Sequence, residues 1–150
     1  VSFIDRVMGH QSQNLNTAVG DFVLRRADGL FSYQLAVVID DHLQGITHVV
    51  RGDDLLSNTA RQIYLQQCLG YPSPSYMHLP IVKDEAGEKL SKQTHAQAID
   101  IHHQQSVLNA LNYSAKHLGI EAGELSGSKT VQEWLSKAIL IWQVKLQARN

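Results

Sequence analysis

Two lysines and a serine lie close together in the segment Lys89-Leu90-Ser91-Lys92. Ammonium groups at this spacing suit a triphosphate such as that of ATP, because they neutralise the charge that builds up as a phosphate bond breaks. A loop that carries them can also close over the nucleotide. A solvated surface loop is the alternative, since lysine pairs at this separation are common on protein surfaces. The segment is therefore a candidate phosphate-binding loop.

An arginine, Arg51, ends a nearly continuous apolar stretch over residues 46–51. Such a stretch predicts a buried strand, and in open α/β sheets ligands bind beyond the carboxyl ends of the strands. A guanidinium there can hold a carboxylate through two charge-assisted bonds, worth about 1.5 to 3 kcal/mol when desolvated. A structural ion pair with Asp53 or Asp54 explains the same pattern equally well, so both interpretations stay open.

Other polar residues carry weaker signals. Tyr33 can offer a ring face and a hydroxyl to a ligand, or can be a half-buried packing residue. His102 and His103 are adjacent, which is poor geometry for chelating one metal, and we expect them at the surface where a helix begins. Cys68, the single cysteine, excludes a disulfide framework and a four-cysteine zinc site, and we expect it to be a core thiol in an intracellular protein.

Size and composition indicate a folded domain. The chain has 150 residues, 43% of them hydrophobic, and a formal net charge of −1. No global positive field would hold nucleic acid, so any contact with it must be local. The sequence shows no secretory signal and no apolar run of the roughly 18 to 20 residues that span a bilayer. The first residue is Val1 rather than Met, so we expect a piece of a longer chain.

The first half reads as α/β. Two short strands joined by an Asp28-Gly29 turn predict a hairpin over residues 21–33. Apolar spacing predicts a helix over residues 35–43, a strand over 46–51, a helix capped by Ser57 or Asn58 and ending at Gly70, and a strand over 78–82. The prolines gather in residues 71–80, which we interpret as an irregular connector.

The second half reads as helical. Apolar residues at helical spacing predict a helix over residues 107–118, stopped by Gly119. Thr130 and Glu133 match a capping box for a last helix, whose apolar face includes Trp134 and Trp142. Strands and helices followed by helices alone indicate part of an α/β domain joined to a helical one.

Five segments in register resemble the second half of bacterial glutamyl-tRNA synthetases and their paralogues: residues 21–29, 33–41, 45–54, 78–80 and 89–93. The order and spacing match from about residue 21 to residue 98. Within this resemblance, Lys89 to Lys92 is similar to the second signature of class I synthetases, usually written KMSKS. The resemblance lowers the weight of the surface-loop interpretation.

Two branches of the family fit. Ordinary glutamyl-tRNA synthetases usually have Arg after the second signature lysine and continue into a large anticodon-binding region. Here the residue is Gln93, and residues 94–99 resemble the short paralogues, the glutamyl-Q tRNA(Asp) synthetases, which attach glutamate to the queuosine base of tRNA(Asp). We prefer the short paralogue. A fragment of an ordinary synthetase and a non-catalytic tRNA-binding module are the alternatives.

The resemblance implies the C-terminal half of a Rossmann-type catalytic domain followed by a helical, stem-contact-like region. Residues 1–33 would end the inserted connective subdomain, residues 34–100 would form the second half of the Rossmann-type domain, and residues 101–150 the helical region. The full enzyme would be a cytoplasmic monomer, with no membrane partner, that uses ATP, Mg²⁺, L-glutamate and queuosine-containing tRNA(Asp).

The resemblance also assigns residues. Tyr33 and Arg51 match the glutamate-binding Tyr and Arg of the family, and Lys92 matches its ATP-binding lysine. Lys89 and Ser91 would support the phosphates, and the backbone at residues 81–82, Ile81 and Val82, matches the stretch along the adenine. The His-Ile-Gly-His-type signature and the cysteines of a possible zinc site would belong to a preceding half, so this fragment would hold no metal and would be inactive alone.

Overall fold

A computed structural model describes residues 1–83, 87, 89–90 and 98–148 of the chain. The chain divides into two compact units, Val1–Leu79 and Pro80–Asn150, which are described separately. The expected three-part division, with boundaries after residues 33 and 100, stays a prediction. Within the described part, every helix is too short or too polar to cross a membrane.

The first unit is built on a four-stranded sheet of order β2-β1-β4-β3. The strands are β1 (Ser2–Asp5), β2 (Gly9–Ser12), β3 (His48–Gly52) and β4 (Ser75–Leu79). β1 and β2 are antiparallel, whereas β4 runs parallel to both β1 and β3. Neither β1 nor β2 is predicted from the sequence.

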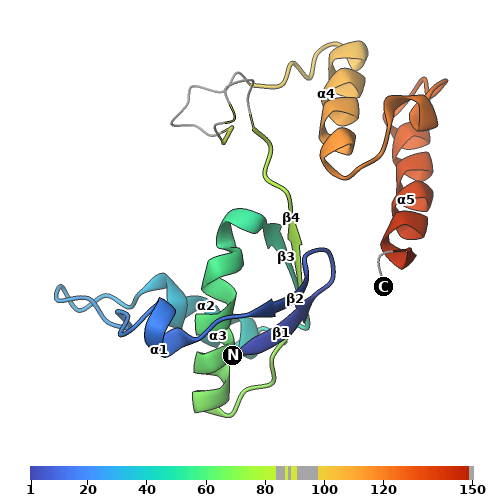
Figure 1. Ribbon diagram of the computed structural model, residues 1–150. Helices are drawn as coiled ribbons and strands as arrows, with labels where there is room; N and C mark the ends of the chain where they lie inside the picture. The colour runs from blue at the N-terminus through green and yellow to red at the C-terminus, as the bar shows by residue number, and fades with distance from the viewer. Residues whose placement is uncertain (84–86, 88, 91–97, 149–150) are drawn as a thin grey trace. The chain divides into compact units, whose positions relative to one another are not determined.

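Three helices belong to this unit: α1 (Leu15–Ala18), α2 (Tyr33–Leu43) and α3 (Leu56–Leu69). α2 and α3 pack against each other (Figure 1). α3 follows β3 through the short 3-10 turn η1 (Asp53–Leu55). α3 ends at Gly70, whose φ of 69° is the left-handed conformation that favours glycine after a helix, as the sequence predicts.

The strand β4 occupies much of the predicted connector over residues 71–80. Pro72 and Pro74 precede β4 and Pro80 follows it, so the prolines flank the strand without interrupting its hydrogen bonds. Its three central residues, Tyr76, Met77 and His78, are all buried, as expected for a strand with neighbours on both sides. The expected strand over residues 78–82 is therefore placed too late in the chain.

The prediction of a two-stranded hairpin over residues 21–33 is wrong, because the structure forms no strands there. Arg25 and Phe31 form a single antiparallel bridge, and the Asp28 side chain accepts a hydrogen bond from the Leu30 amide within the turn. Leu30 and Phe31 are exposed, so an extended ladder here would bury little apolar surface. Tyr33 is the first residue of α2 and not the end of a strand.

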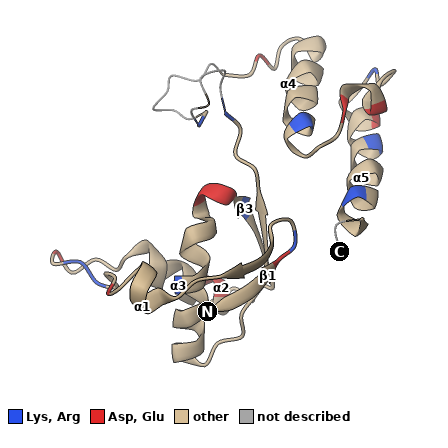
Figure 2. Cartoon of the chain, in the orientation of Figure 1, with Lys and Arg blue, Asp and Glu red and all other residues tan. Residues whose placement is uncertain are grey.

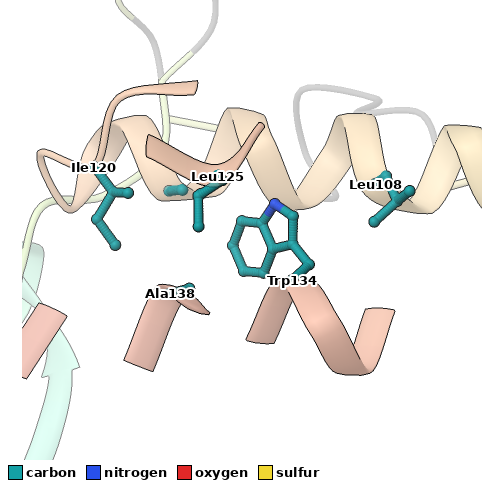
Figure 3. Close-up of a cluster of buried hydrophobic side chains, with 6 residues drawn as sticks. Leu108, Ile120, Leu125, Trp134 and Ala138 are labelled. Atoms are coloured by element: carbon teal, nitrogen blue, oxygen red, sulfur yellow. The ribbon is translucent and has the colours of Figure 1, made fainter. Parts of the chain in front are cut away.

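The second unit packs α4 (Gln104–His117) against α5 (Val131–Gln147), with the 3-10 turn η3 (Ala122–Leu125) between them. Figure 3 shows Trp134 and Ala138 of α5 with Leu108, Ile120 and Leu125, all of them buried. The cap on α5 is as predicted, because the Thr130 side chain accepts a hydrogen bond from the Glu133 amide at 3.2 Å. The Glu133 carboxylate accepts from the Lys129 amide instead of the Thr130 amide.

Candidate functional site

Arg51 lies near the carboxyl end of β3, where the sequence places a ligand-binding arginine. Parallel pairing sets Arg51 directly opposite His78 of β4. Residues opposite each other in neighbouring strands project from the same face of the sheet. The two side chains therefore meet on one face, and α3 contacts this face through Thr59.

The guanidinium of Arg51 is held by neutral groups. Its Nε donates a hydrogen bond to Nε2 of His78 at 3.0 Å, and its Nη2 donates to the Thr59 hydroxyl at 2.8 Å. A longer contact of 3.5 Å joins Nη2 to the Leu55 carbonyl. Since an arginine carries N–H groups on three nitrogens, these contacts fix the group through Nε and Nη2. Among the described residues, Nη1 has no hydrogen-bond partner.

Tyr76 packs against the Arg51 guanidinium. The Arg51 side chain lies over the Tyr76 ring, 5.6 Å from its centroid. Burial raises the pKa of the Tyr76 hydroxyl, and repulsion from Asp41 and Tyr33 in their ionised forms raises it further, against the lowering effects of a hydrogen bond from Gln66 and of the Arg51 charge. The phenol therefore stays neutral at neutral pH. These couplings bring Tyr33 and Arg51, two predicted site residues, into the electrostatic surroundings of the same hydroxyl.

Asp41 is the carboxylate that faces this cluster from α2. Burial raises its pKa, the Arg51 charge lowers it, and the Asp40 charge raises it, with a net shift above its usual value. Coulombic attraction from Arg51 is thus smaller than the burial effect. Asp41 balances part of the cationic charge of the site without forming a direct ion pair.

Tyr33 stands at the first turn of α2 and is 52% exposed, so both its packing role and its ligand role stay predictions. The next residue anchors this turn. Gln34 donates a hydrogen bond to Asn58 at 3.0 Å and accepts one from Gln62 at 3.0 Å, both on α3. Asn58 therefore does not cap α3, whose N-cap is Leu55 without a side-chain hydrogen bond.

The candidate phosphate-binding loop belongs to the second unit. Lys89 is exposed and pairs with Lys83 in a single antiparallel bridge, and the Leu90 amide donates to the Val82 carbonyl at 3.0 Å. Ile81 and Val82 are half-buried just before this turn. Ser91 and Lys92, the other two predicted groups of the loop, lie outside the described residues.

No three His, Cys, Asp or Glu side chains come together to hold a metal within residues 1–83, 87, 89–90 and 98–148. His102 and His103 are exposed at the start of α4, in agreement with the predicted surface position, and His103 forms a 2.8 Å contact with the Asp100 carboxylate. The expected core position of Cys68 is wrong. Its thiol is exposed on α3 because the buried residues of that helix lie on another face.

Sequence reasoning missed the residues behind Arg51. Asp5 is buried and contacts His78 from β1, 73 positions earlier in the chain. Thr59 is buried on α3. One signal was available for Asp5: an Asp shortly before a Gly marks a turn in which the carboxylate accepts backbone N–H bonds. The amides of Val7 and Met8 donate to it in this way.

The family follows from a comparison with family models. Residues 1–120 match the catalytic domain of the class I tRNA synthetases of the E and Q type, where the letters stand for glutamate and glutamine. The chain belongs to this family. The match covers both the sheet that carries Arg51 and the candidate phosphate-binding loop.

Several curated relatives that the chain matches are named glutamyl-Q tRNA(Asp) synthetases. The chain is 53% identical over 148 residues to the one from Cupriavidus metallidurans. The aligned region covers 99% of this chain and 46% of that protein. It is 55% identical over 142 residues to the one from Burkholderia cenocepacia. Here the aligned region covers 95% of this chain and 47% of that protein. The chain of this E- and Q-type synthetase thus spans about half the length of the curated relatives it matches.

Solved structures confirm the fold. The glutamate-tRNA synthetase of Elizabethkingia anophelis is 39% identical, with a TM-score of 0.55 over 62% of this chain and 19% of that protein. A glutamate tRNA ligase from Elizabethkingia meningosepticum, solved in complex with its amino acid, gives a TM-score of 0.56 over 62% of this chain and 18% of that protein. The predicted α/β fold, the second part of a class I synthetase catalytic domain, is therefore confirmed.

Proposed function

We propose that the complete protein containing this chain activates L-glutamate with ATP and transfers it to the queuosine base of tRNA(Asp). The observation that carries the proposal is an arginine at the end of β3 with a terminal nitrogen left available, in a chain more than half identical to glutamyl-Q tRNA(Asp) synthetases. The queuosine target rests on the names of these relatives.

The first step is proposed as an attack of a glutamate carboxylate oxygen on the α-phosphorus of ATP. The bond between the α-phosphorus and the bridging oxygen breaks, and the products are glutamyl-adenylate and pyrophosphate. The adenylate then passes its glutamyl group to tRNA and releases AMP. The protein contributes positioning and charge stabilisation, and no covalent enzyme intermediate is required.

Two described residues would hold glutamate. Arg51 supplies a cation fixed from behind, and a carboxylate that meets such a group in a desolvated site gains about 1.5 to 3 kcal/mol. Tyr33 supplies an accessible ring and hydroxyl at the start of α2. Both therefore serve binding and orientation of glutamate in the proposal.

The residues proposed for ATP binding belong to the second unit. Lys92, with Lys89 and Ser91, would neutralise the phosphates, and the backbone at Ile81 and Val82 would lie along the adenine. Mg²⁺ would accompany ATP as in other members of the family. The described residues bring no set of metal-ligating side chains together, so none of them is assigned to the ion.

The test is glutamate-dependent exchange of pyrophosphate into ATP by the complete protein, with and without tRNA. Exchange without tRNA is expected for a glutamyl-Q synthetase. Exchange that needs tRNA would instead support an ordinary glutamyl-tRNA synthetase, the enzyme after which the solved relatives are named. Lys92→Ala is the control that should abolish exchange. Absence of exchange in both conditions would support a non-catalytic tRNA-binding module.

A further inference from the structure

A buried acid–imidazole pair lies behind Arg51. The Asp5 carboxylate and the Nδ1 atom of His78 are 2.7 Å apart, and both side chains have no exposed surface. The two residues come from β1 and β4, which are neighbours in the sheet. His78 in turn contacts Arg51 through its other ring nitrogen. The proposed chemistry uses neither Asp5 nor His78, yet the pair connects the sheet to the guanidinium.

The contacts on both sides select one neutral tautomer of His78. An arginine nitrogen can only donate, so Nε2 of His78 must accept the Arg51 hydrogen bond and carry no proton. The ring proton then resides on Nδ1 and is donated to Asp5. The Thr59 hydroxyl, 3.2 Å from Nε2 and an acceptor for Arg51, can donate its own proton to the same nitrogen.

Asp5 is well suited to impose this tautomer because it is an ionised acceptor. One carboxylate oxygen accepts from the amides of Val7 and Met8, and the other faces Nδ1, while the His78 amide lies within hydrogen-bond distance of both oxygens. Burial raises the pKa of Asp5, but the hydrogen bonds from Met8, His78 and Val7 outweigh it and bring the pKa below its usual value. An ionised carboxylate cannot donate, so Nδ1 has to.

We propose that Asp5 and His78 are positioning residues for glutamate recognition: Asp5 fixes the His78 tautomer, and His78 Nε2 holds the Arg51 guanidinium so that Nη1 remains directed to ligand. This inference rests on the proposed function. Neither residue contacts glutamate in this proposal. Their effect reaches the substrate through the orientation of Arg51.

Two substitutions of His78 separate positioning from packing. His78→Gln can place its carbonyl oxygen where Nε2 stood and so retains an acceptor for Arg51. His78→Asn can retain a donor to Asp5 but leaves no acceptor within reach of Arg51. In pyrophosphate exchange by the complete protein, we expect His78→Asn to raise the KM for glutamate by about 10-fold and His78→Gln by less than about 3-fold. The KM for ATP should stay unchanged in both.

The matched control for the pyrophosphate-exchange assay is a substitution of another histidine, His42. His42 lies on α2 stacked on Tyr71 and is not among the hydrogen-bond partners of Arg51, so His42→Asn should leave both KM values unchanged. Equal effects of His78→Asn and His78→Gln on the glutamate KM would overturn the positioning role. If the unsubstituted protein shows no glutamate-dependent exchange, the proposed function fails, and the inference fails with it.

The tautomer can be observed independently of activity. Imidazole ¹⁵N chemical shifts of the chain should show His78 protonated at Nδ1. In Asp5→Asn, the single carbonyl oxygen is expected to keep the Val7 and Met8 amide donors and to accept from the His78 amide, which contacts both carboxylate oxygens of Asp5. This turns the side-chain NH₂ toward Nδ1 and moves the ring proton to Nε2. Two donors would then face each other at Arg51, and the glutamate KM should rise as in His78→Asn. An Nε2-protonated ring in the unsubstituted chain would overturn the inference.

Discussion

At the scale of single residues, Arg51 is partly buried and its charge is not neutralised by its hydrogen-bond partners. An imidazole, a hydroxyl and a carbonyl hold it, and each of these is a neutral acceptor. A structural ion pair would instead consume the charge that a substrate carboxylate needs. Ligand binding by Arg51 and the structural ion pair with Asp53 or Asp54 therefore stay alternative predictions.

Arg51→Ala in the complete protein should raise the KM for glutamate by about 10- to 100-fold, because it removes a charge-assisted contact and leaves His78 and Thr59 without their donor. The KM for ATP should change little. Steady-state pyrophosphate exchange measures both. Arg26→Ala, which removes only an exposed ion pair with Asp28, is the control. An unchanged glutamate requirement in Arg51→Ala would assign the arginine to structure alone.

Asp5 should make the stability of the first unit depend on pH. Its folded pKa lies below 3.8, so its contribution is fully present above that unfolded value, decreases as the pH falls below it, and is lost once the pH passes the folded value. Native-state hydrogen exchange of the β4 amides between pH 5 and pH 2, corrected for intrinsic rates, measures this loss of stability. The loss should be about 1.4 kcal/mol for each unit by which the folded pKa of Asp5 lies below the unfolded pKa. Asp5→Asn should flatten the profile. An equally steep profile in that variant would assign the dependence to other groups.

At the scale of elements, local patterns predicted most helices and one strand well. α3, α4 and α5 carry apolar faces and end signals that can be read within a few residues, and Gly70 ends α3 as predicted. β1 and β2 are only four residues long and mostly polar, so they lack a periodic signal. Their pairing comes from long-range contacts such as Asp5 with His78, which no local pattern contains.

In the candidate site, too, local sequence patterns predict some residues, whereas others depend on long-range contacts. Arg51 could be predicted because strand end and residue type coincide in one segment. Asp5 and Thr59 could not, because their roles arise only when β1, β4 and α3 come together. The hairpin prediction failed since turn residues at Asp28-Gly29 fix a turn but provide no apolar face for strands to bury.

The cap of α5 offers a test at this scale. Thr130→Ala removes the side-chain acceptor of the Glu133 amide and should lower the free energy of unfolding by about 1 kcal/mol. Urea unfolding followed by tryptophan fluorescence measures it, because both tryptophans lie on α5. Ser136→Ala, an exposed change within the same helix, should leave stability equal or slightly raised. Equal destabilisation by both variants would contradict the capping role.

At the scale of the whole molecule, each unit has its own buried residues. Val38, Ala60 and Ile63 belong to the first unit, and Leu108 and Trp134 to the second. Acidic and basic positions are interspersed along the chain (Figure 2), in keeping with the net charge of −1. No strong field of one sign is therefore expected from this chain.

Separate cores predict separate unfolding transitions. Leu108→Ala opens a cavity beside Trp134 and should lower the urea stability read by tryptophan fluorescence by about 2 to 5 kcal/mol. Hydrogen-exchange protection of the β4 amides, which reports on the first unit, should stay unchanged. Val38→Ala should lower the protection of the β4 amides and leave the tryptophan transition unchanged, because Val38 is buried on α2 while both tryptophans lie on α5. A tryptophan transition that moves equally in both variants would show that the chain unfolds as one cooperative unit.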